Sequence, residues 1–399
     1  MKKILEHIFI AEIIFFSGSI YLKQFQSQLL ILLFLTGLLL FLSSKSRFLK
    51  TNVHISITIV LWILFIQYFL ITEKTNLAYL SFILNSVGVA LGLSSITLNR
   101  FKTLILRQMS ILMAISIIIQ LGYNFGDLPT TTFTSDLNNG KTFHMFAKIF
   151  NVDWDGNGRM SSIYWEPGQC QILIMFTLCL FGKELLHPTK QELICFGILI
   201  LAIIMTMSTM GYLVLALLIA GLFMFSKKKR GKYFVIKWGL GIIVAIASSF
   251  LLWNSSVVQE KLAQKDDASD RTSYAIRMAD NIACWNVSLE SPIFGMGFET
   301  KKVKSRLINS GSETASNGWL YTSACFGFPF ILFIMYTMYK RIKEMYNNIL
   351  PPFLIFMVLF IAQCNEYALF YPYLYIYIFQ FKKNNNQNKS RTLELDLKP

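Results

Sequence analysis

Charged residues are scarce in this chain of 399 residues. Asp, Glu, Lys and Arg make up 15% of it, whereas a soluble globular protein carries about 25%. Hydrophobic residues make up 54%. They recur in blocks of roughly twenty residues, the length that crosses a hydrocarbon layer. A soluble fold is excluded, because a core so rich in Phe, Leu and Ile would have no polar face to show to water. The composition predicts an all-α integral membrane protein.

Patterns that would hold a metal, a nucleotide or a disulfide framework are also missing. Of the six cysteines only Cys284 lies well inside a polar loop, and it has no obvious partner. The four histidines are scattered without metal-ligand spacing. The sequence contains no phosphate-binding glycine motif, no G-x-S-x-G and no internal repeat. We therefore expect neither a metal nor a cofactor.

Twelve apolar blocks are predicted to be transmembrane helices, although several are near the lower length limit for a span. No small-residue cleavage site follows the first block, so we expect a retained helix and not a signal peptide. Residues 1–382 would form one polytopic domain, followed by a disordered cytoplasmic tail, 383–399. The predicted spans are 6–22, 28–43, 53–72, 77–98, 106–122, 168–182, 192–208, 210–226, 233–253, 318–338, 350–365 and 367–381.

The distribution of Lys and Arg predicts the orientation. With the N-terminus inside, the inner loops hold most of the basic residues, and the short outer loops hold only Lys23 and Lys74. Both termini are therefore predicted to be cytoplasmic, with two long loops outside, at about 123–167 and 254–317. The net charge of +15 then serves topology and contact with anionic membrane lipid, and we expect no nucleic-acid partner.

The first outer loop ends in an unusual charged stretch, GRMSSIYWEPGQCQ, residues 158–171. Its early part, 127–140, is turn-rich and expected to be irregular. Glu166 is fixed at the membrane boundary by the Pro-Gly that follows it, at a depth where charges are less screened. Interfacial anchoring of Arg159 and Glu166 is the alternative. The desolvation cost of an unpaired carboxylate favours a functional role.

A helix is predicted in the second outer loop, because apolar residues recur there at spacings of three and four. Ser269 or Asp270 can cap its start, and Ser291-Pro292 stops it. It would lie on the membrane surface or across the top of the bundle. Its apolar face holds Ala275, Met278, Ile282, Trp285 and Leu289, and another face holds Arg277, Asn281, Cys284 and Ser288.

Two glycines and a basic cluster follow this helix. Gly295 and Gly297 permit a tight turn and a close backbone approach, unless they are ordinary loop residues. The cluster at 301–306 is either a solvated face or a further cationic site. Ser316 and Asn317 then give the next span a polar start, like the one at Glu166.

Arginines above an apolar bundle suit a diphosphate whose lipid tail lies in the bilayer. A guanidinium group can grip phosphate oxygens through two parallel hydrogen bonds and stays charged at any accessible pH. A diphosphate leaving group needs its developing charge stabilised, and no acidic metal-binding pair stands out. A nearby carboxylate could take the proton from an attacking sugar hydroxyl.

These motifs resemble the O-antigen polymerase (Wzy-like) and O-antigen ligase superfamily. The resemblance covers roughly 120–340: Arg159 with its Glu-Pro-Gly, the arginine-bearing helix with Ser291–Gly297, and Ser316-Asn317. It implies a C-type polytopic glycosyltransferase of the bacterial inner (plasma) membrane. Such enzymes move an oligosaccharide from undecaprenyl diphosphate onto an acceptor at the outer face.

The resemblance also implies roles for single residues. Arg159 and one of Arg271 or Arg277 would contact the diphosphate, and Glu166 would be the base or orient the acceptor. Ligases of this kind commonly carry a histidine where Ser316 stands, which favours a polymerase. A chain-length regulator protein is a further candidate partner. The candidate substrate-binding residues are Arg271, Gly295, Gly297, Glu313 and Asn317, and Glu313 is also a second candidate for the carboxylate.

Two alternatives to the polymerase stay open. A ligase would transfer finished glycan to lipid A-core. A flippase or transporter for lipid-linked oligosaccharide would need a cavity lined by charges or by paired broken helices. Glu12 lies within the first predicted span and Glu366 between the last two, at depths where a charge costs a few kcal/mol. We interpret Glu366 as an outer turn residue and leave the role of Glu12 open.

Overall fold

The computed structural model describes twelve stretches of the chain. They are 1–20, 26–66, 77–126, 128–135, 141–153, 158–182, 184–225, 273–298, 300–309, 317–346, 352–364 and 371–383. The predicted span 233–253 and the tail beyond residue 383 lie outside these stretches. Arg271, Glu313, Ser316 and Glu366 lie outside them as well.

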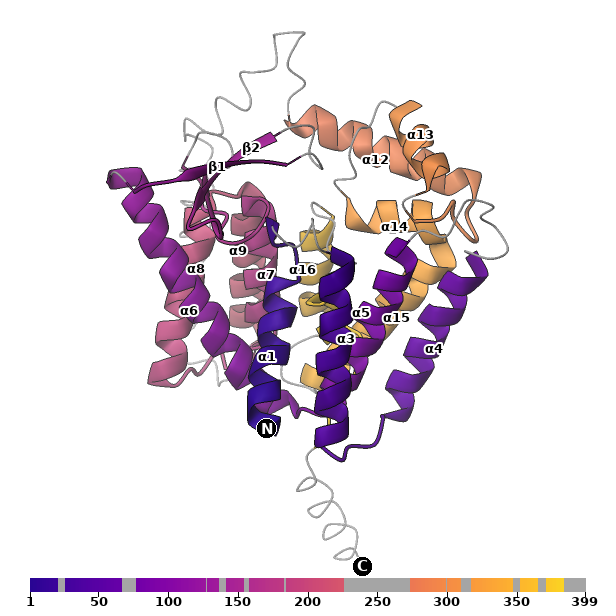
Figure 1. Cartoon of the computed structure of the whole chain (residues 1–399), viewed down its shortest axis with the longest axis horizontal. Coiled ribbons are helices and arrows are strands. Elements are labelled where there is room, and N and C mark those ends of the chain that lie inside the picture. The colour runs from indigo at the N-terminus through magenta and orange to yellow at the C-terminus, as the bar shows by residue number, and fades with distance from the viewer. Residues whose placement is uncertain are drawn as a thin grey trace, which may run out of the picture.

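The described residues form thirteen α-helices, so the predicted helical architecture is confirmed for most of the chain (Figure 1). The N-terminus lies at one end of the bundle, and the strands lie with α12 and α13 at the other, which we call the outer end. The helices are α1 (Lys2–Phe15), α3 (Gln26–Ser43), α4 (Lys50–Phe65), α5 (Leu77–Leu93), α6 (Leu98–Phe125), α7 (Pro167–Cys179), α8 (Lys190–Met205), α9 (Thr209–Phe225), α12 (Ser273–Glu290), α13 (Lys301–Asn309), α14 (Gly318–Phe326), α15 (Phe328–Tyr346) and α16 (Pro352–Gln363).

Among the described helices, α6 alone is both long and apolar enough to cross a membrane, with 28 residues and a mean hydropathy of 1.9 over its most apolar 18 residues. The other apolar helices are shorter, so the number of twelve spans stays a prediction. Large apolar side chains are exposed along the outside of several helices. Leu61 of α4 is 60% exposed and Ile118 of α6 is 70% exposed. Apolar faces of this kind are stable against lipid and costly in water.

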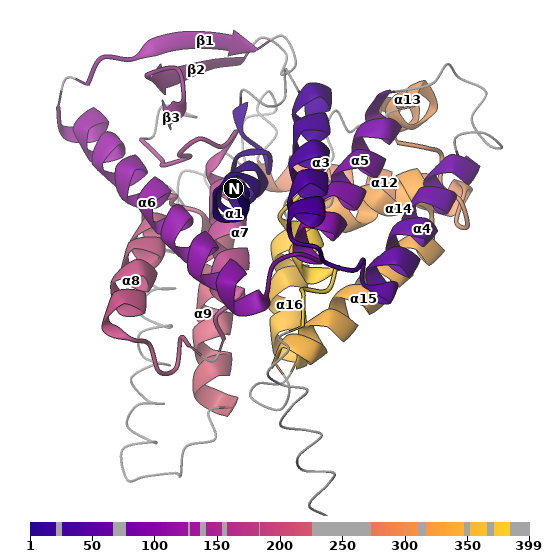
Figure 2. The ribbon, with the colours of Figure 1, turned by 60° about the horizontal axis from the view of Figure 1, so that its bottom comes forward.

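The first outer loop contains a sheet, and the prediction that 127–140 is irregular is wrong for residues Thr131–Ser135, which form a strand. β1 (Thr131–Ser135), β2 (Lys141–Phe146) and β3 (Phe150–Asp153) pair antiparallel in the order β1-β2-β3. Phe133 and Phe143 face each other across β1 and β2, and the Phe143 ring packs on Trp165 at 4.8 Å between centroids. Threonine and aromatic residues favour strands when one face is covered. Figure 2 shows the sheet beside the outer end of α6.

The predicted span 318–338 is broken at Gly327 into α14 and α15. Gly327 has a φ of +82°, a left-handed conformation that favours glycine. The backbone N–H groups of Met296 and Gly297 donate to the carbonyls of Ala324 and Cys325, at 2.8 and 2.9 Å. The chain after α12 thereby satisfies carbonyls that the broken helix leaves open. Figures 1 and 2 both show α12 alongside α14.

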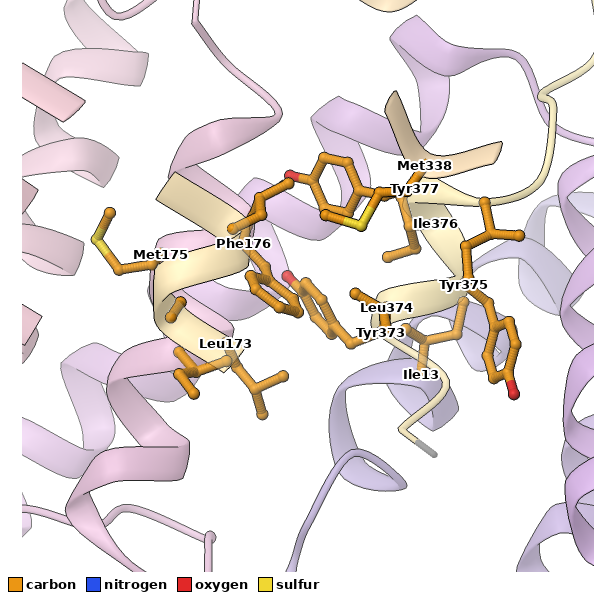
Figure 3. Close-up of a cluster of buried hydrophobic side chains, with 14 of the residues drawn as sticks. Ile13, Leu173, Met175, Phe176, Met338, Tyr373, Leu374, Tyr375, Ile376 and Tyr377 are labelled. Carbon is orange, nitrogen blue, oxygen red and sulfur yellow. The ribbon is translucent and has the colours of Figure 1, made fainter. Parts of the chain in front are cut away.

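The last predicted span, 367–381, is not a regular α-helix in its described part. Residues 371–383 contain one 3-10 turn, η3 (Leu374–Tyr377), and run through the centre of the bundle (Figure 3). The Tyr377 hydroxyl donates to the Phe176 carbonyl, and Tyr373 shares a hydrogen bond with Thr177. The segment fills the middle of the bundle.

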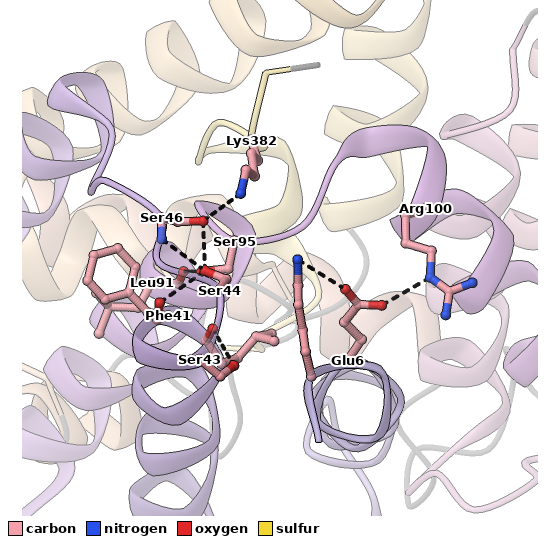
Figure 4. Close-up of polar contacts among 11 residues, drawn as sticks. Glu6, Phe41, Ser43, Ser44, Ser46, Leu91, Ser95, Arg100 and Lys382 are labelled. Carbon is pink, nitrogen blue, oxygen red and sulfur yellow. Dashed lines mark hydrogen bonds and ion pairs between the residues drawn. The ribbon is translucent and has the colours of Figure 1, made fainter. Parts of the chain in front are cut away.

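Polar contacts join the elements at the end opposite the sheet (Figure 4). Glu6 lies 3.0 Å from Arg100 and 3.9 Å from Lys2. The Lys382 ammonium donates to Ser46 Oγ at 2.9 Å. Residues near the N-terminus and Lys382 therefore make their polar contacts at the same end of the bundle. The orientation in a membrane stays a prediction.

Candidate functional site at the outer end of the bundle

The backbone that carries Arg159 is fixed to the outer end of α6. Gln120 Nε2 donates to the carbonyls of Val152 and Gly158, at 2.9 and 3.0 Å. Gly158 has a φ of +63°, and a Cβ at this position would lie 2.9 Å from Asn124 Oδ1. A larger residue at position 158 would therefore be strained. The backbone directly before Arg159 is therefore held in one position.

Arg159 itself is half-buried and reaches the turn between α8 and α9. Its Nε donates to the Thr206 carbonyl at 3.2 Å, and the Met160 N–H donates to the Met205 carbonyl at 3.0 Å. Both acceptors lie at the C-terminal end of α8, where the helix dipole places partial negative charge. A guanidinium group is stabilised there, so Arg159 is held against the protein.

Two non-glycine residues with left-handed backbone flank this contact. Ser162, on the segment of Arg159, has a φ of +60°, and Met207, next to Thr206, has a φ of +47°. Ser162 is kept in place by two hydrogen bonds of 2.7 Å. Its Oγ shares one with Ser116 Oγ, and its carbonyl accepts the other from the Asn151 N–H. Strained residues of this kind cost about 1–3 kcal/mol each and cluster at functional sites.

Glu166 is the N-cap residue of α7. Its carbonyl accepts the Cys170 N–H at 3.2 Å, and within the described structure its carboxylate makes no capping hydrogen bond. The preceding N–H, of Trp165, donates to the Gly18 carbonyl at 3.1 Å. Glu166 is half-buried at the outer start of a helix that is buried almost throughout. The positive N-terminal dipole of α7 stabilises a carboxylate here.

The predicted helix of the second outer loop is confirmed as α12, and its apolar stripe is largely exposed. Met278 and Ile282 are about half exposed, whereas the opposite face packs on α14. Ser288 Oγ lies 2.6 Å from Ser323 Oγ at this contact. Burial and, to a lesser extent, Asp280 raise the pKa of the Cys284 thiol to about 12.

Arg277 lies on α12, at the same end of the bundle as Arg159 and Glu166, and is half-buried. The structure places all three residues at the outer end, in three separate elements. Their roles towards a substrate stay predictions.

The remaining described candidates all have packing roles. A Cβ at Gly295, where φ is +69°, would lie 2.3 Å from the Cys325 carbonyl carbon. The Gly297 N–H is used by the Cys325 carbonyl. Asn317 Oδ1 caps α14 by accepting the N–H groups of Trp319 and Leu320, each at 3.1 Å. Substrate binding by Gly295, Gly297 and Asn317 stays a prediction.

Sequence reasoning missed the amide side chains near the start of α7. Gln169 is buried, and its Nε2 donates to the Tyr371 hydroxyl at 2.7 Å. Gln171 is 1% exposed. The signal was present, because two glutamines inside an apolar span are expensive unless they bind something. An amide carries no charge, so it does not stand out from the sequence as Arg159 and Glu166 do.

The described parts of the chain contain no cluster of three or more His, Cys, Asp or Glu side chains that could hold a metal ion.

The fold and the polar outer end indicate a helical membrane protein. Residues 194–335 match the model of the O-antigen ligase family, from α8 into α15. This match is consistent with the predicted resemblance to the O-antigen polymerase and ligase superfamily. It includes Arg277, Gly295, Gly297 and Asn317, and it begins after Arg159 and Glu166. No curated protein matches the chain. No solved structure matches it either.

Proposed function

We propose that this chain is a surface-polysaccharide polymerase of the O-antigen type, a glycosyltransferase of the bacterial inner membrane. It transfers the growing glycan from undecaprenyl diphosphate to the non-reducing sugar of a new lipid-linked repeat unit at the periplasmic face. The observation that carries the proposal is the half-buried Arg159, anchored on Thr206 inside the region that matches the O-antigen ligase family.

In the proposed reaction, an acceptor hydroxyl oxygen attacks the anomeric carbon of the donor sugar. The bond from that carbon to the diphosphate oxygen breaks, and the electron pair leaves with the diphosphate on its lipid. Arg159, with Arg277 or Arg271, stabilises the charge that develops on the diphosphate. Glu166 takes the proton of the attacking hydroxyl, and Glu313 is the second candidate for this role.

The test is elongation of a lipid-linked repeat unit by the purified chain in lipid nanodiscs. Arg159→Ala should lower the rate about 100-fold or more, the usual effect of removing one donor to a developing charge. The matched control is Arg107→Ala, because Arg107 is an exposed arginine in the half of α6 away from the sheet. An Arg159→Ala protein that inserts normally and elongates at the wild-type rate would rule the proposal out. Full activity of Glu166→Gln would remove Glu166 as the base.

The second candidate function is O-antigen ligation, favoured by the description of the matching family. A ligase attaches finished glycan to lipid A-core. Deletion separates the two activities: loss of a polymerase leaves single repeats on the surface, whereas loss of a ligase leaves no surface glycan. Ser316, in place of the histidine that similar ligases carry, is the reason that polymerase stands first.

A flippase or transporter is the third candidate. The buried segment 371–383 in the middle of the bundle supports the enzyme, because it occupies the place where an alternating cavity would run. Movement of labelled carrier lipid across vesicles by the purified chain, without any elongation of glycan, would reverse this order.

A further inference from the structure

Two buried polar side-chain atoms near Arg159 make no hydrogen bond. Within the described structure, Gln171 Oε1 and Ser161 Oγ lack a hydrogen-bond partner, and their residues are 1% and 0% exposed. A buried polar group without a partner carries a free-energy cost close to that of a lost hydrogen bond. A cost of this kind next to a candidate site points to a ligand that the two groups would meet.

A short series of contacts links Gln171 to Arg159. A Cβ at Gly211, in the first turn of α9, would lie 2.7 Å from Gln171 Oε1. The Gly211 N–H donates to Ser208 Oγ at 3.4 Å, and the turn that holds Ser208 also contains Thr206, which accepts the Arg159 guanidinium. Gln171 and Arg159 therefore adjoin the same turn between α8 and α9. Ser161 lies two positions after Arg159.

We infer that Gln171, together with Ser161, forms a subsite for hydroxyl groups of the sugar that the diphosphate carries. The inference rests on the proposed function and adds a place for the glycan beside Arg159. An amide oxygen accepts a hydrogen bond from a hydroxyl group but repels phosphate oxygens, so Gln171 fits the sugar and not the diphosphate. In the lipid-linked glycan the first sugar is bonded directly to the diphosphate. A diphosphate on Arg159 would therefore place that sugar beside this turn.

The side chains of Gln171 and Ser161 are closed off from solvent in this structure. A sugar can therefore reach them only if a neighbouring part of the chain moves. The part that would move is the turn between α8 and α9, where Met207 has a left-handed backbone, because segment 158–162 is held by Gln120 and Ser116. Strain in the closed state lowers the cost of opening it. α7 would stay fixed, because it is buried from end to end between other helices.

The test compares the binding of two lipids to the full chain in nanodiscs. The first is undecaprenyl diphosphate, and the second is the same carrier bearing the repeat unit isolated from the host cell. Gln171→Leu should weaken binding of the glycan-bearing lipid about tenfold and leave binding of the bare diphosphate unchanged. Arg159→Ala should weaken both. Ser161→Ala should give a smaller loss of the same selective kind.

Gln108→Leu is the matched control. Gln108 Oε1 is also buried without a partner, but its Nε2 donates to the His7 carbonyl towards the opposite end of the bundle. It should bind both lipids like wild type. Gly211→Ala is a second route to the same effect, because the added methyl group would push the Gln171 amide aside. It covers the case in which Gln171→Leu folds poorly.

The two proposals fail in different ways. If Gln171→Leu and Gly211→Ala bind the two lipids with the wild-type ratio while Arg159→Ala weakens both, the sugar subsite is wrong and the proposed function stands. In that case the Gln171 amide oxygen either binds a buried water molecule or stays without a hydrogen-bond partner between the helices. If wild-type protein binds neither lipid, the proposed function and the subsite are both wrong.

Discussion

Gly327 provides a strict test of how the outer helices are attached to the bundle. Its φ is +82°, and a Cβ there would lie 2.0 Å from the Ile293 carbonyl oxygen and 2.8 Å from the Phe294 nitrogen. Both neighbours are backbone atoms, so neither can rotate away. Gly327→Ala must therefore shift the chain after α12 away from the break between α14 and α15.

The cost of this substitution has two parts. With a ψ of 165°, Gly327 lies in a backbone region that is almost restricted to glycine and costs another residue about 1–3 kcal/mol. Displacing the chain would also break the hydrogen bonds that Met296 and Gly297 donate to α14, each worth about 1 kcal/mol. We expect Gly327→Ala to lose about 3 kcal/mol of stability and to lose elongation as well, because α12 carries Arg277.

The measurement is thermal unfolding of the purified protein, together with the elongation rate. Gly197→Ala is the matched control, since Gly197 lies inside α8 and a Cβ there would meet none of the described atoms within 4 Å. That change should leave activity intact and stabilise the protein by up to about 1 kcal/mol. If the Gly327 and Gly197 variants unfold at the same temperature, the role assigned to the break is refuted.

Three further predictions concern single side chains. Asn317→Ala should lower stability by about 1 kcal/mol because α14 loses its N-cap, and thermal unfolding of Asn317→Asp should show most of it restored. Gln120→Leu should reduce elongation about tenfold without preventing insertion, because it frees the backbone before Arg159; an unchanged rate would contradict this. Cys284 should resist maleimide at pH 8 in the folded protein and react once the protein is denatured, as mass spectrometry can show. Folding raises the pKa of the Cys284 thiol from 9.0 to about 12, so the thiol loses its proton at a lower pH in the unfolded chain than in the folded one. As the pH rises from 9 to 12, this thiol therefore makes the folded state less stable.

The helices could be predicted where local sequence decides their position. The block at 28–43 lies within α3, and α7 begins directly after Glu166 because proline at the first helical position sets its start. The sheet could not be predicted in this way. The run TTFTS is flanked by turn residues, and it becomes a strand only because β2 pairs with it over the Trp165 side chain.

Two predicted spans show the limit of reasoning from apolar length. Residues 318–338 are apolar enough for one helix, but the break at Gly327 is stabilised by the chain after α12, which no local pattern reveals. Residues 367–381 are apolar enough as well. Their described part is buried on all sides by other helices, so the backbone does not need to form a regular helix.

The charged residues of the candidate site could be predicted from the sequence, but the residues that hold them in place could not. Arg159 and Glu166 stand out because charge is rare beside an apolar block. Their fixation depends on Gln120 and Thr206, which are distant in sequence and look like ordinary helix-end residues. The amide of Gln171 went unnoticed because its missing partner becomes visible only in three dimensions.

The central claim is that Arg159 contacts the diphosphate of a lipid-linked glycan. The most direct measurement is protection of arginines from a dicarbonyl reagent, read by peptide mass spectrometry of the protein in nanodiscs. Saturating undecaprenyl diphosphate should slow modification of Arg159 and leave that of the exposed Arg107 unchanged. Equal rates of modification at Arg159 with and without the lipid would contradict the account.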